Sequence, residues 1–146
     1  MHENQLQGDI PNFLPLPTSL PGMVGLSVAG LGTVILLPAS IFYIDFAHNL
    51  FNATISTAIG NYITSIFSFS LSNNQLRGSI PPSICNAQFV SVIDLSNNEL
   101  NDMIPSCLMD NRVFDVLNLR SNKLVGTIPD TFQPSLSLET LDLSGN

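Results

Sequence analysis

The segment LSNNQLRGSIP, at residues 71–81, decides the fold because its pattern returns twice further along the chain. LSNNELNDMIP occupies residues 95–105, and LRSNKLVGTIP occupies residues 119–129. A fixed period of this kind is typical of a solenoid, whose repeats are stable only when each one stacks on its neighbours. One asparagine in each block marks the period at an almost constant spacing: Asn49, Asn74, Asn98, Asn122 and Asn146.

Apolar residues alternate with polar ones just before each of these landmark asparagines. Such alternation predicts a short strand with one buried face. Stacked repeats set these strands side by side, so the predicted fold class is an α/β solenoid with a parallel β-sheet on the concave face. The predicted inward pairs are Ile44 and Phe46, Phe69 and Leu71, Ile93 and Leu95, Leu117 and Leu119, and Leu141 and Leu143.

The landmark asparagines follow from the same geometry. The chain turns sharply after each strand, which leaves backbone N–H and C=O groups facing the interior. An amide side chain can satisfy both kinds of group. We therefore predict that the five landmark asparagines form a structural ladder. Loss of one of them would leave buried polar groups without hydrogen-bond partners, at a cost of roughly 1–3 kcal/mol.

Composition argues against several classes of function. Four basic residues oppose eleven acidic ones, so the chain has no cationic surface with which to bind nucleic acid. His2 and His48 belong to no ligand-like cluster, so we predict neither a metal site nor a cofactor. No nucleophile elbow, phosphate loop or spaced carboxylate pair is present in the sequence. The chain is therefore predicted to be non-enzymatic.

The two cysteines, Cys85 and Cys107, leave two interpretations open. They could form one disulfide, or both could be small buried residues, since unpaired cysteine is among the most often buried residue types. Their spacing lacks the paired clusters of a structural zinc site. We favour two unpaired, buried cysteines.

With these residues in view, the sequence resembles the plant-specific class of leucine-rich repeats, whose hallmark is LxGxIP. NQLQGDIP at residues 4–11, together with the blocks quoted above, is similar to ectodomain repeats of plant receptor-like proteins of the Verticillium-wilt-resistance type. The resemblance covers roughly residues 1–11 and 38–146. It implies a horseshoe segment of about five to six repeats, each of about 24 residues, uncapped at both ends. Because both ends fall within repeats, we expect a fragment of such a receptor.

That resemblance implies a recognition protein of immune or developmental signalling, located at the plasma membrane or outside the cell. It would bind a peptide or protein ligand and signal through a receptor-kinase co-receptor. Its membrane association would come from a C-terminal anchor that this chain lacks or from residues 22–44, and the start of the chain does not read as a signal peptide. Two alternatives stay open: a soluble inhibitor of cell-wall-degrading enzymes, and a non-functional truncated remnant.

Residues 12–37 do not fit the repeat and separate a partial repeat at 1–11 from the array at 38–146. Gly22 to Ile44 contains no charged residue. As a helix it would reach about 35 Å, enough to cross a hydrocarbon core of about 30 Å. We favour a degenerate or inserted apolar segment, because a membrane span would separate residues 1–11 from the repeats on which they should stack. A transmembrane helix over about 22–44 is the alternative.

The outward-facing residues of the predicted strands form the surface that solenoids usually present to ligands. Aspartate and serine recur there as ordinary solvated residues of the repeat, whereas large amphipathic or planar charged groups carry more binding energy. Asn52 lies in the single Asn-x-Ser/Thr sequence of the chain and is a predicted glycosylation site. The predicted ligand contacts are Tyr43, Asp45, His48, Asp94, Asn118, Arg120 and Asp142.

Overall fold

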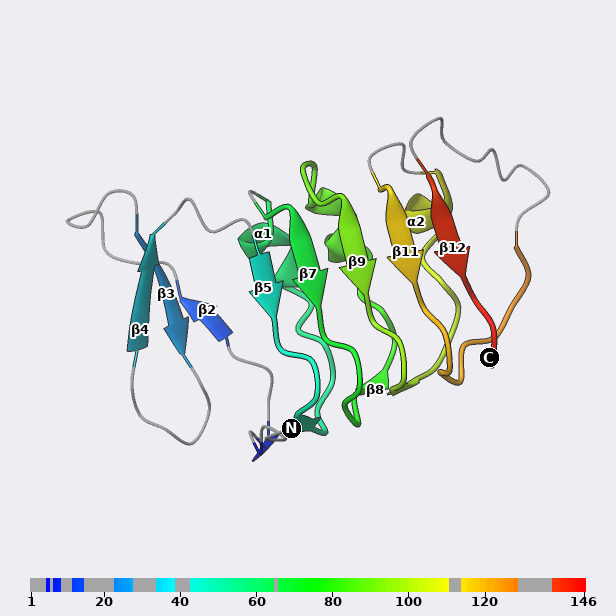
Figure 1. Ribbon diagram of the computed structural model, residues 1–146, viewed down its shortest axis with the longest axis horizontal. Helices are drawn as coiled ribbons and strands as arrows, with labels where there is room; N and C mark the ends of the chain where they lie inside the picture. Colours follow the sequence, from blue (N-terminus) through cyan, green and yellow to red (C-terminus); the bar gives the residue numbers. More distant parts are fainter. Residues whose placement is uncertain are drawn as a thin grey trace.

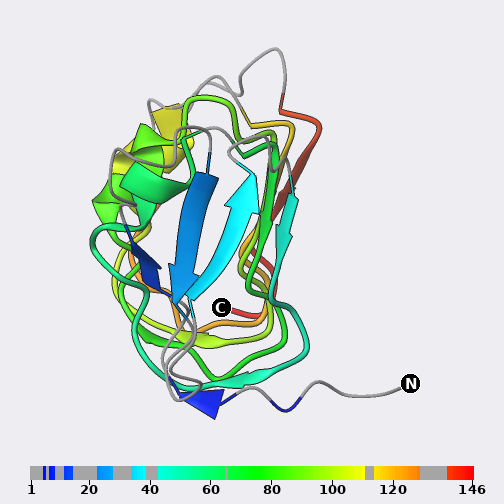
Figure 2. The same ribbon diagram turned by 90° about the vertical axis from the view of Figure 1, so that its left-hand side faces the viewer.

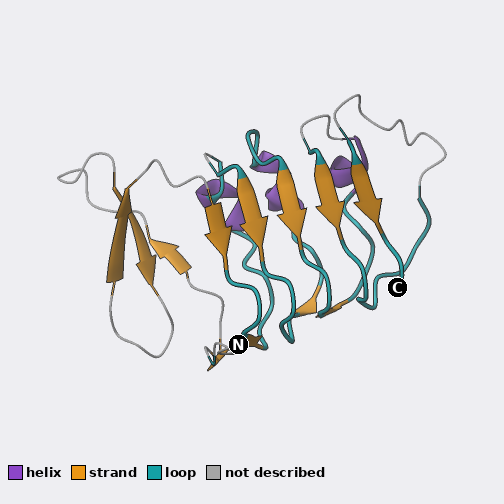
Figure 3. Ribbon diagram, in the orientation of Figure 1, coloured by secondary structure: helices purple, strands orange, loops and turns teal. Residues whose placement is uncertain are grey.

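The computed structural model describes residues 5, 7–8, 12–14, 23–27, 34–38, 43–64, 66–110, 114–128 and 138–146. Asn4 and Pro129 of the repeat pattern, and the basic residue Arg112, lie outside the described residues. Strands gather on one side of the array of repeats, and short helices lie on the other (Figure 1, Figure 3).

Five parallel strands form the main sheet, and their order in space follows their order in the chain. Successive strands pair in one register, so that Ile44 lies opposite Phe69 and Phe69 opposite Ile93. The predicted parallel sheet is therefore confirmed. The strands are β5 (Tyr43–Asp45), β7 (Ser68–Ser70), β9 (Val92–Asp94), β11 (Val116–Asn118) and β12 (Thr140–Asp142).

The core lies behind this sheet. The middle residue of each inner strand is buried together with the residue two positions later, and Phe69, Leu71, Ile93 and Leu95 are all 0 % exposed. Fully burying one such side chain contributes about 1.5–3 kcal/mol. These residues belong to one continuous core cluster, so each repeat depends on its neighbours.

Among the described residues, three short helices line the outer side, opposite the sheet. In each helix, the residue ten positions after a landmark asparagine is buried: Ile59, Ile84 and Leu108. Helices this short are not stable alone, so this packing must hold them. They are α1 (Ile59–Tyr62), η1 (Pro82–Asn86) and α2 (Ser106–Asp110).

Two pairs of two-residue strands join neighbouring repeats at the bends between the sheet and the outer side. β8 (Arg77–Gly78) pairs in parallel with β10 (Glu99–Leu100), and β1 (Gln7–Gly8) pairs in parallel with β6 (Leu50–Phe51). The bend requires a positive φ, which is +77° at Gly78 and +66° at Asp102 in the following repeat. A residue with a Cβ loses about 1–2 kcal/mol in this conformation, so glycine recurs there.

The apolar segment near the N-terminus contains strands. β2 (Asn12–Leu14), β3 (Met23–Ser27) and β4 (Val34–Pro38) form a three-stranded antiparallel sheet. The alternative of a helix over 22–44 is therefore wrong for 23–27 and 34–38. Its glycines disfavour a helix, whereas valine and isoleucine suit strands. Among the residues placed by the structure, no helix is long and apolar enough to cross a membrane. The boundaries of segment 12–37 stay a prediction.

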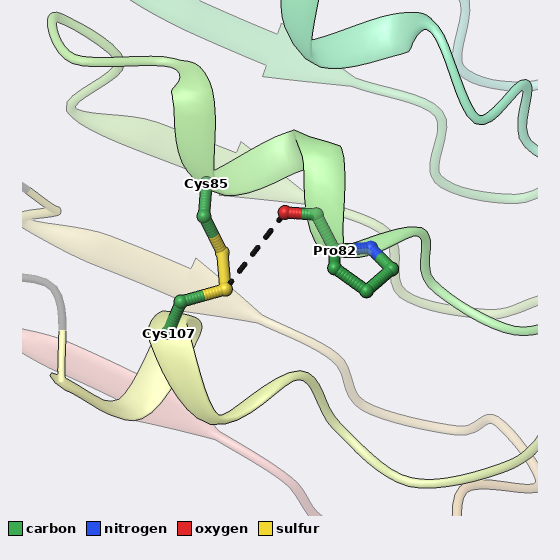
Figure 4. The surroundings of a disulfide bond; sticks show 3 residues. All are labelled: Pro82, Cys85 and Cys107. Carbon is green, nitrogen blue, oxygen red and sulfur yellow. Dashed lines mark hydrogen bonds between the residues drawn. A yellow bond between two sulfur atoms is a disulfide. The ribbon is translucent and has the colours of Figure 1, made fainter.

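Cys85 on η1 and Cys107 on α2 form a disulfide, with their Cα atoms 6.0 Å apart (Figure 4). Our preference for two unpaired cysteines was therefore wrong. The physical reason is the repeat itself. The sequence separation of 22 is close to one period, so the two cysteines lie on successive turns of the outer layer. The bond ties two neighbouring repeats together on the side opposite the sheet.

Replacing both cysteines, as Cys85→Ala with Cys107→Ala, should lower the free energy of unfolding by about 3 kcal/mol, since a loop of this length is then free in the unfolded chain. Urea denaturation with and without reductant measures this. The double variant should match the reduced parent. A native protein with free thiols, or an unchanged urea midpoint, contradicts the prediction.

Candidate ligand-binding face

The open face of the five-stranded sheet is the candidate site. The middle residue of each strand points into the core, so the first and third residues lie on the open face. The strand pairings align them into two rows across the sheet. The first row is Tyr43, Ser68, Val92, Val116 and Thr140, and the third-residue row is Asp45, Ser70, Asp94, Asn118 and Asp142.

The third-residue row shapes the turn that follows each strand. Its Asp and Asn side chains accept a hydrogen bond from the backbone N–H two residues later, which is the geometry of an Asx turn. The distances are 2.8 Å for Asp45 to Ala47, 2.9 Å for Asp94 to Ser96, 3.2 Å for Asn118 to Arg120 and 2.9 Å for Asp142 to Ser144. From the sequence, these groups were interpreted as ligand contacts or as solvated residues of the repeat, although aspartate or asparagine before a turn is itself a signal for this role.

Asp142 has the most strongly hydrogen-bonded carboxylate of this row. The Ser144 hydroxyl donates to its Oδ1 at 2.7 Å and the Ser144 N–H donates at 2.9 Å. These two bonds, with a smaller contribution from the positive charge of Arg120, hold the pKa of Asp142 below its usual value. This carboxylate therefore stays ionised at neutral pH.

Ser144→Ala should raise the pKa of Asp142 toward its ordinary value, because the hydroxyl is the largest cause of the depression. NMR titration of the carboxyl carbon measures this, and Ser144→Thr should restore the low pKa. A depressed folded pKa stabilises the fold above the unfolded pKa of about 3.9, and that contribution is lost as pH falls through the folded value. The stability difference between parent and Ser144→Ala should therefore vanish in acid. A pKa of Asp142 that is the same in both contradicts the prediction.

A further column of residues turns the chain after each strand. All five have positive φ, between +53° and +76°. Asparagine and glycine tolerate this conformation best. His48 is therefore a turn residue that is also exposed, and its Nε2 lies 3.5 Å from Nδ2 of Asn73. The column is His48, Asn73, Asn97, Ser121 and Gly145.

Aromatic rings are exposed at one end of the face. Tyr43 is 69 % exposed, and its ring meets the edge of Phe67, which is 42 % exposed, at a centroid distance of 5.9 Å. Phe67 was not among the predicted contacts. Its alternation with Phe69 and Leu71 suggests the buried side, whereas the strand begins only at Ser68 and leaves Phe67 exposed. Val92 and Val116 continue the first row as half-buried residues. Large exposed aromatic groups are the residues that most often dominate binding.

The sequence-predicted contacts lie in two groups on the sheet. Tyr43 and Asp45 lie on β5, with His48 in the turn after it. Asp94, Asn118 and Asp142 lie side by side on β9, β11 and β12 at the other end, where Arg120 is exposed in the turn after β11. One ligand would have to run across the sheet to contact both groups.

The landmark asparagines connect neighbouring repeats beneath this face. Each of the last four accepts, through its Oδ1, the N–H of a residue in the previous repeat: Asn74 from Phe51 at 3.1 Å, Asn98 from Leu76 at 3.0 Å, Asn122 from Leu100 at 3.1 Å and Asn146 from Leu124 at 3.2 Å. Asn49 donates to the carbonyl oxygens of Phe46 and Ala47. The amides therefore hold the turns at their spacing.

Other features lie away from the open face. A cavity of about 720 Å³ is lined by buried residues such as Ile80 and Leu124 and by exposed ones such as Met103, Val125 and Ile128. None of its lining residues belongs to the five strands, so it is separate from the candidate face. Asn52 is exposed just after β6. Within the part of the chain that the structure describes, no group of three or more His, Cys, Asp and Glu residues could hold a metal ion.

Comparison with known proteins agrees with this geometry. A family model described as leucine rich repeat matches residues 88–146, and a second leucine-rich-repeat model matches residues 65–87. Residues 65–146 are leucine-rich repeats. No curated protein sequence matches the chain.

Solved plant leucine-rich-repeat ectodomains are similar to this chain. A chain of the BIR3–SERK2 complex from Arabidopsis thaliana is 35 % identical with a TM-score of 0.56, over 59 % of this chain and 46 % of that one. The plant peptide hormone receptor RGFR1, solved with RGF2, is 30 % identical with a TM-score of 0.54, over 57 % and 13 %. The Arabidopsis thaliana receptor kinase HAESA, solved with an IDA peptide, is 27 % identical with a TM-score of 0.50, over 61 % and 19 %. The chain spans less than half the length of these proteins.

Proposed function

We propose that the chain is a non-enzymatic recognition module of a plant leucine-rich-repeat receptor, of the receptor-like-protein type, and that its concave face binds a peptide or protein ligand. The observation that carries this proposal is the exposed face itself, with an aromatic pair at one end and a row of polar side chains across all five strands. The similar ectodomains of RGFR1 and HAESA were solved with peptide hormones, which supports a peptide as the ligand.

The charges of the face favour a particular ligand chemistry. Asp45, Asp94 and Asp142 lie in one row, and Arg120 is the basic residue beside them. Complementary charge steers association and sets the orientation of a partner. The proposed ligand therefore has a basic group for the carboxylates and an apolar side chain for the Tyr43–Phe67 pair.

The proposed location is extracellular, at the plasma membrane, where such a receptor would serve immune or developmental signalling. The disulfide between Cys85 and Cys107 supports an oxidising compartment. Asn52 is exposed and is proposed to carry a glycan. A second leucine-rich-repeat receptor is the proposed co-receptor, since the similar BIR3–SERK2 structure is itself a complex.

Peptides selected from a random display library on the purified chain, then resynthesised, would test this proposal. Tyr43→Ala should weaken their binding about tenfold or more, which corresponds to about 1.4 kcal/mol. Asp94→Asn should weaken binding of basic peptides, and lessen its salt dependence, without losing the turn. The asparagine can accept the same hydrogen bond, as Asn118 does in the next repeat.

Phe89→Ala is the matched control, because Phe89 is 68 % exposed but lies outside the five strands. Circular dichroism should show all three variants folded. Peptides that bind equally well to parent, Tyr43→Ala and Asp94→Asn would contradict the proposed face. Loss of binding only in Phe89→Ala would also contradict it.

A further inference from the structure

Two repeats that are far apart in sequence lie next to each other in space. In the regular array, β8 pairs with β10 so that Arg77 lies opposite Glu99 and Gly78 opposite Leu100. Near the N-terminus, β1 pairs with β6 in the same way, with Gln7 opposite Leu50 and Gly8 opposite Phe51.

The sequences of these paired strands also correspond. NQLQG at residues 4–8 aligns with NQLRG at residues 74–78, and Leu50-Phe51 follow Asn49 as Glu99-Leu100 follow Asn98. The β1–β6 pair therefore has the register of two adjacent repeats. No complete repeat is needed between them.

The connection between these adjacent repeats is too long for an ordinary one. In the regular array, residues 79–91 suffice to lead from β8 to the next main strand, β9. Residues 9–42 lead from β1 to β5, so this connection is more than twice as long as its regular counterpart. It contains β2, β3 and β4, whose pairing is antiparallel, whereas the main sheet is parallel. The three-stranded sheet is therefore an addition to the repeat pattern.

The two ends of the core differ in burial. At the C-terminal end, Leu141 and Leu143 are only half-buried. At the other end, Ile44 is only 8 % exposed, although it lies on β5, which among the described residues is the last strand of the parallel sheet on that side. Viewed from that end, β3 and β4 cross the opening between the main sheet and the outer helices (Figure 2). Figure 1 shows the three added strands beyond the β5 end of the main sheet, with β2 nearest to β5.

The added strands are apolar in sequence. They read NFL, MVGLS and VILLP and contain no charged residue. A segment that covers an apolar core requires such a sequence, and this use accounts for the uncharged stretch from Gly22 to Ile44.

We propose that the connection over residues 9–42 contains an insertion between two adjacent repeats, and that the inserted three-stranded sheet covers the N-terminal end of the solenoid core. The sheet is thus an internal cap of the solenoid and does not bind lipid.

Cysteine cross-linking in the full chain tests the adjacency. Gln7→Cys with Leu50→Cys should form a disulfide, found by peptide mapping without reduction, as efficiently as the control pair Arg77→Cys with Glu99→Cys. The control pair occupies the same register position in the regular array. A control pair that cross-links while the first pair stays reduced would overturn the insertion. Flotation with phosphatidylcholine liposomes tests the cap, which predicts that the full chain stays unbound. A chain that floats with the liposomes would overturn the cap.

Hydrogen exchange tests the cover itself. Replacing residues 9–42 by a Gly/Ser linker as long as the regular connection should speed amide exchange over residues 51–63 on the order of tenfold, because the core end is then open to water. Replacing them by a copy of residues 79–91, with alanine in place of the cysteine, should restore slow exchange, since an ordinary repeat connection packs there. Unchanged exchange in the Gly/Ser variant overturns the cap, as does exchange equally fast in both variants.

Discussion

Asn98→Ala is expected to lower the free energy of unfolding by roughly 4 kcal/mol. The buried Leu76 N–H left without a partner costs about 1–3 kcal/mol, and each of the two amide-to-carbonyl bonds lost costs about 0.5–1.5 kcal/mol, since those carbonyls keep bonds from Asn74 and Asn122. Asn98 is 8 % exposed and joins two repeats. Its Oδ1 accepts the N–H of Leu76 at 3.0 Å, and its Nδ2 donates to the carbonyl oxygen of Leu71 at 3.0 Å and to that of Leu95 at 3.2 Å. Alanine replaces none of these bonds.

Urea denaturation followed by circular dichroism measures the effect of Asn98→Ala. Asn101→Ala is the control, because Asn101 is an exposed asparagine three positions later in the same repeat, and its backbone N–H keeps its bond to the carbonyl of Gly78. The control should change stability by less than about 0.5 kcal/mol, as is usual for surface substitutions. Equal urea midpoints for the two variants would show that the amide does not hold the repeats together.

Gly60→Ala is also expected to destabilise the protein by roughly 4 kcal/mol, above the usual range of about 1–3 kcal/mol for overpacking. A Cβ built on Gly60 would lie 1.5 Å from the carbonyl oxygen of Ser83 and 2.3 Å from its carbonyl carbon. Both atoms are backbone of η1, so no side chain can rotate away and the two outer helices must separate. In an isolated helix the same substitution would be favourable by about 1 kcal/mol. The sign of the effect therefore reports how closely α1 packs on η1.

Thermal unfolding of Gly60→Ala beside Asn61→Ala separates packing from helix propensity. Asn61 is the next residue of α1 and is exposed. Its replacement should leave the melting temperature unchanged or slightly higher, because alanine is the better helix former. A Gly60→Ala variant as stable as Asn61→Ala would mean that α1 and η1 do not pack as closely as the structure has them.

The candidate face could be predicted only in part. Tyr43 and Asp94 were predicted to lie on the open face because strand residues alternate between two sides, and the structure places both there. Phe67 was missed because its alternation with Phe69 suggests the buried side, whereas the strand begins only at Ser68. The bond of Asp94 to the Ser96 N–H was missed for another reason. Alternation gives the side of a residue and says nothing of its hydrogen-bond partners.

The repeat period was enough to predict the parallel sheet and the inward residues Ile44, Phe69, Ile93, Leu117 and Leu141. A recurring spacing constrains every unit in the same way, so local pattern and tertiary contact coincide. Two contacts needed the tertiary structure. The disulfide between Cys85 and Cys107 occurs once among the repeats, and the β1–β6 pair joins segments that are much more than one period apart in sequence, so the period alone marks neither contact. The strands within Gly22 to Ile44 needed it too, because a continuous apolar run suits a helix or a strand, and only contact with the rest of the chain selects one.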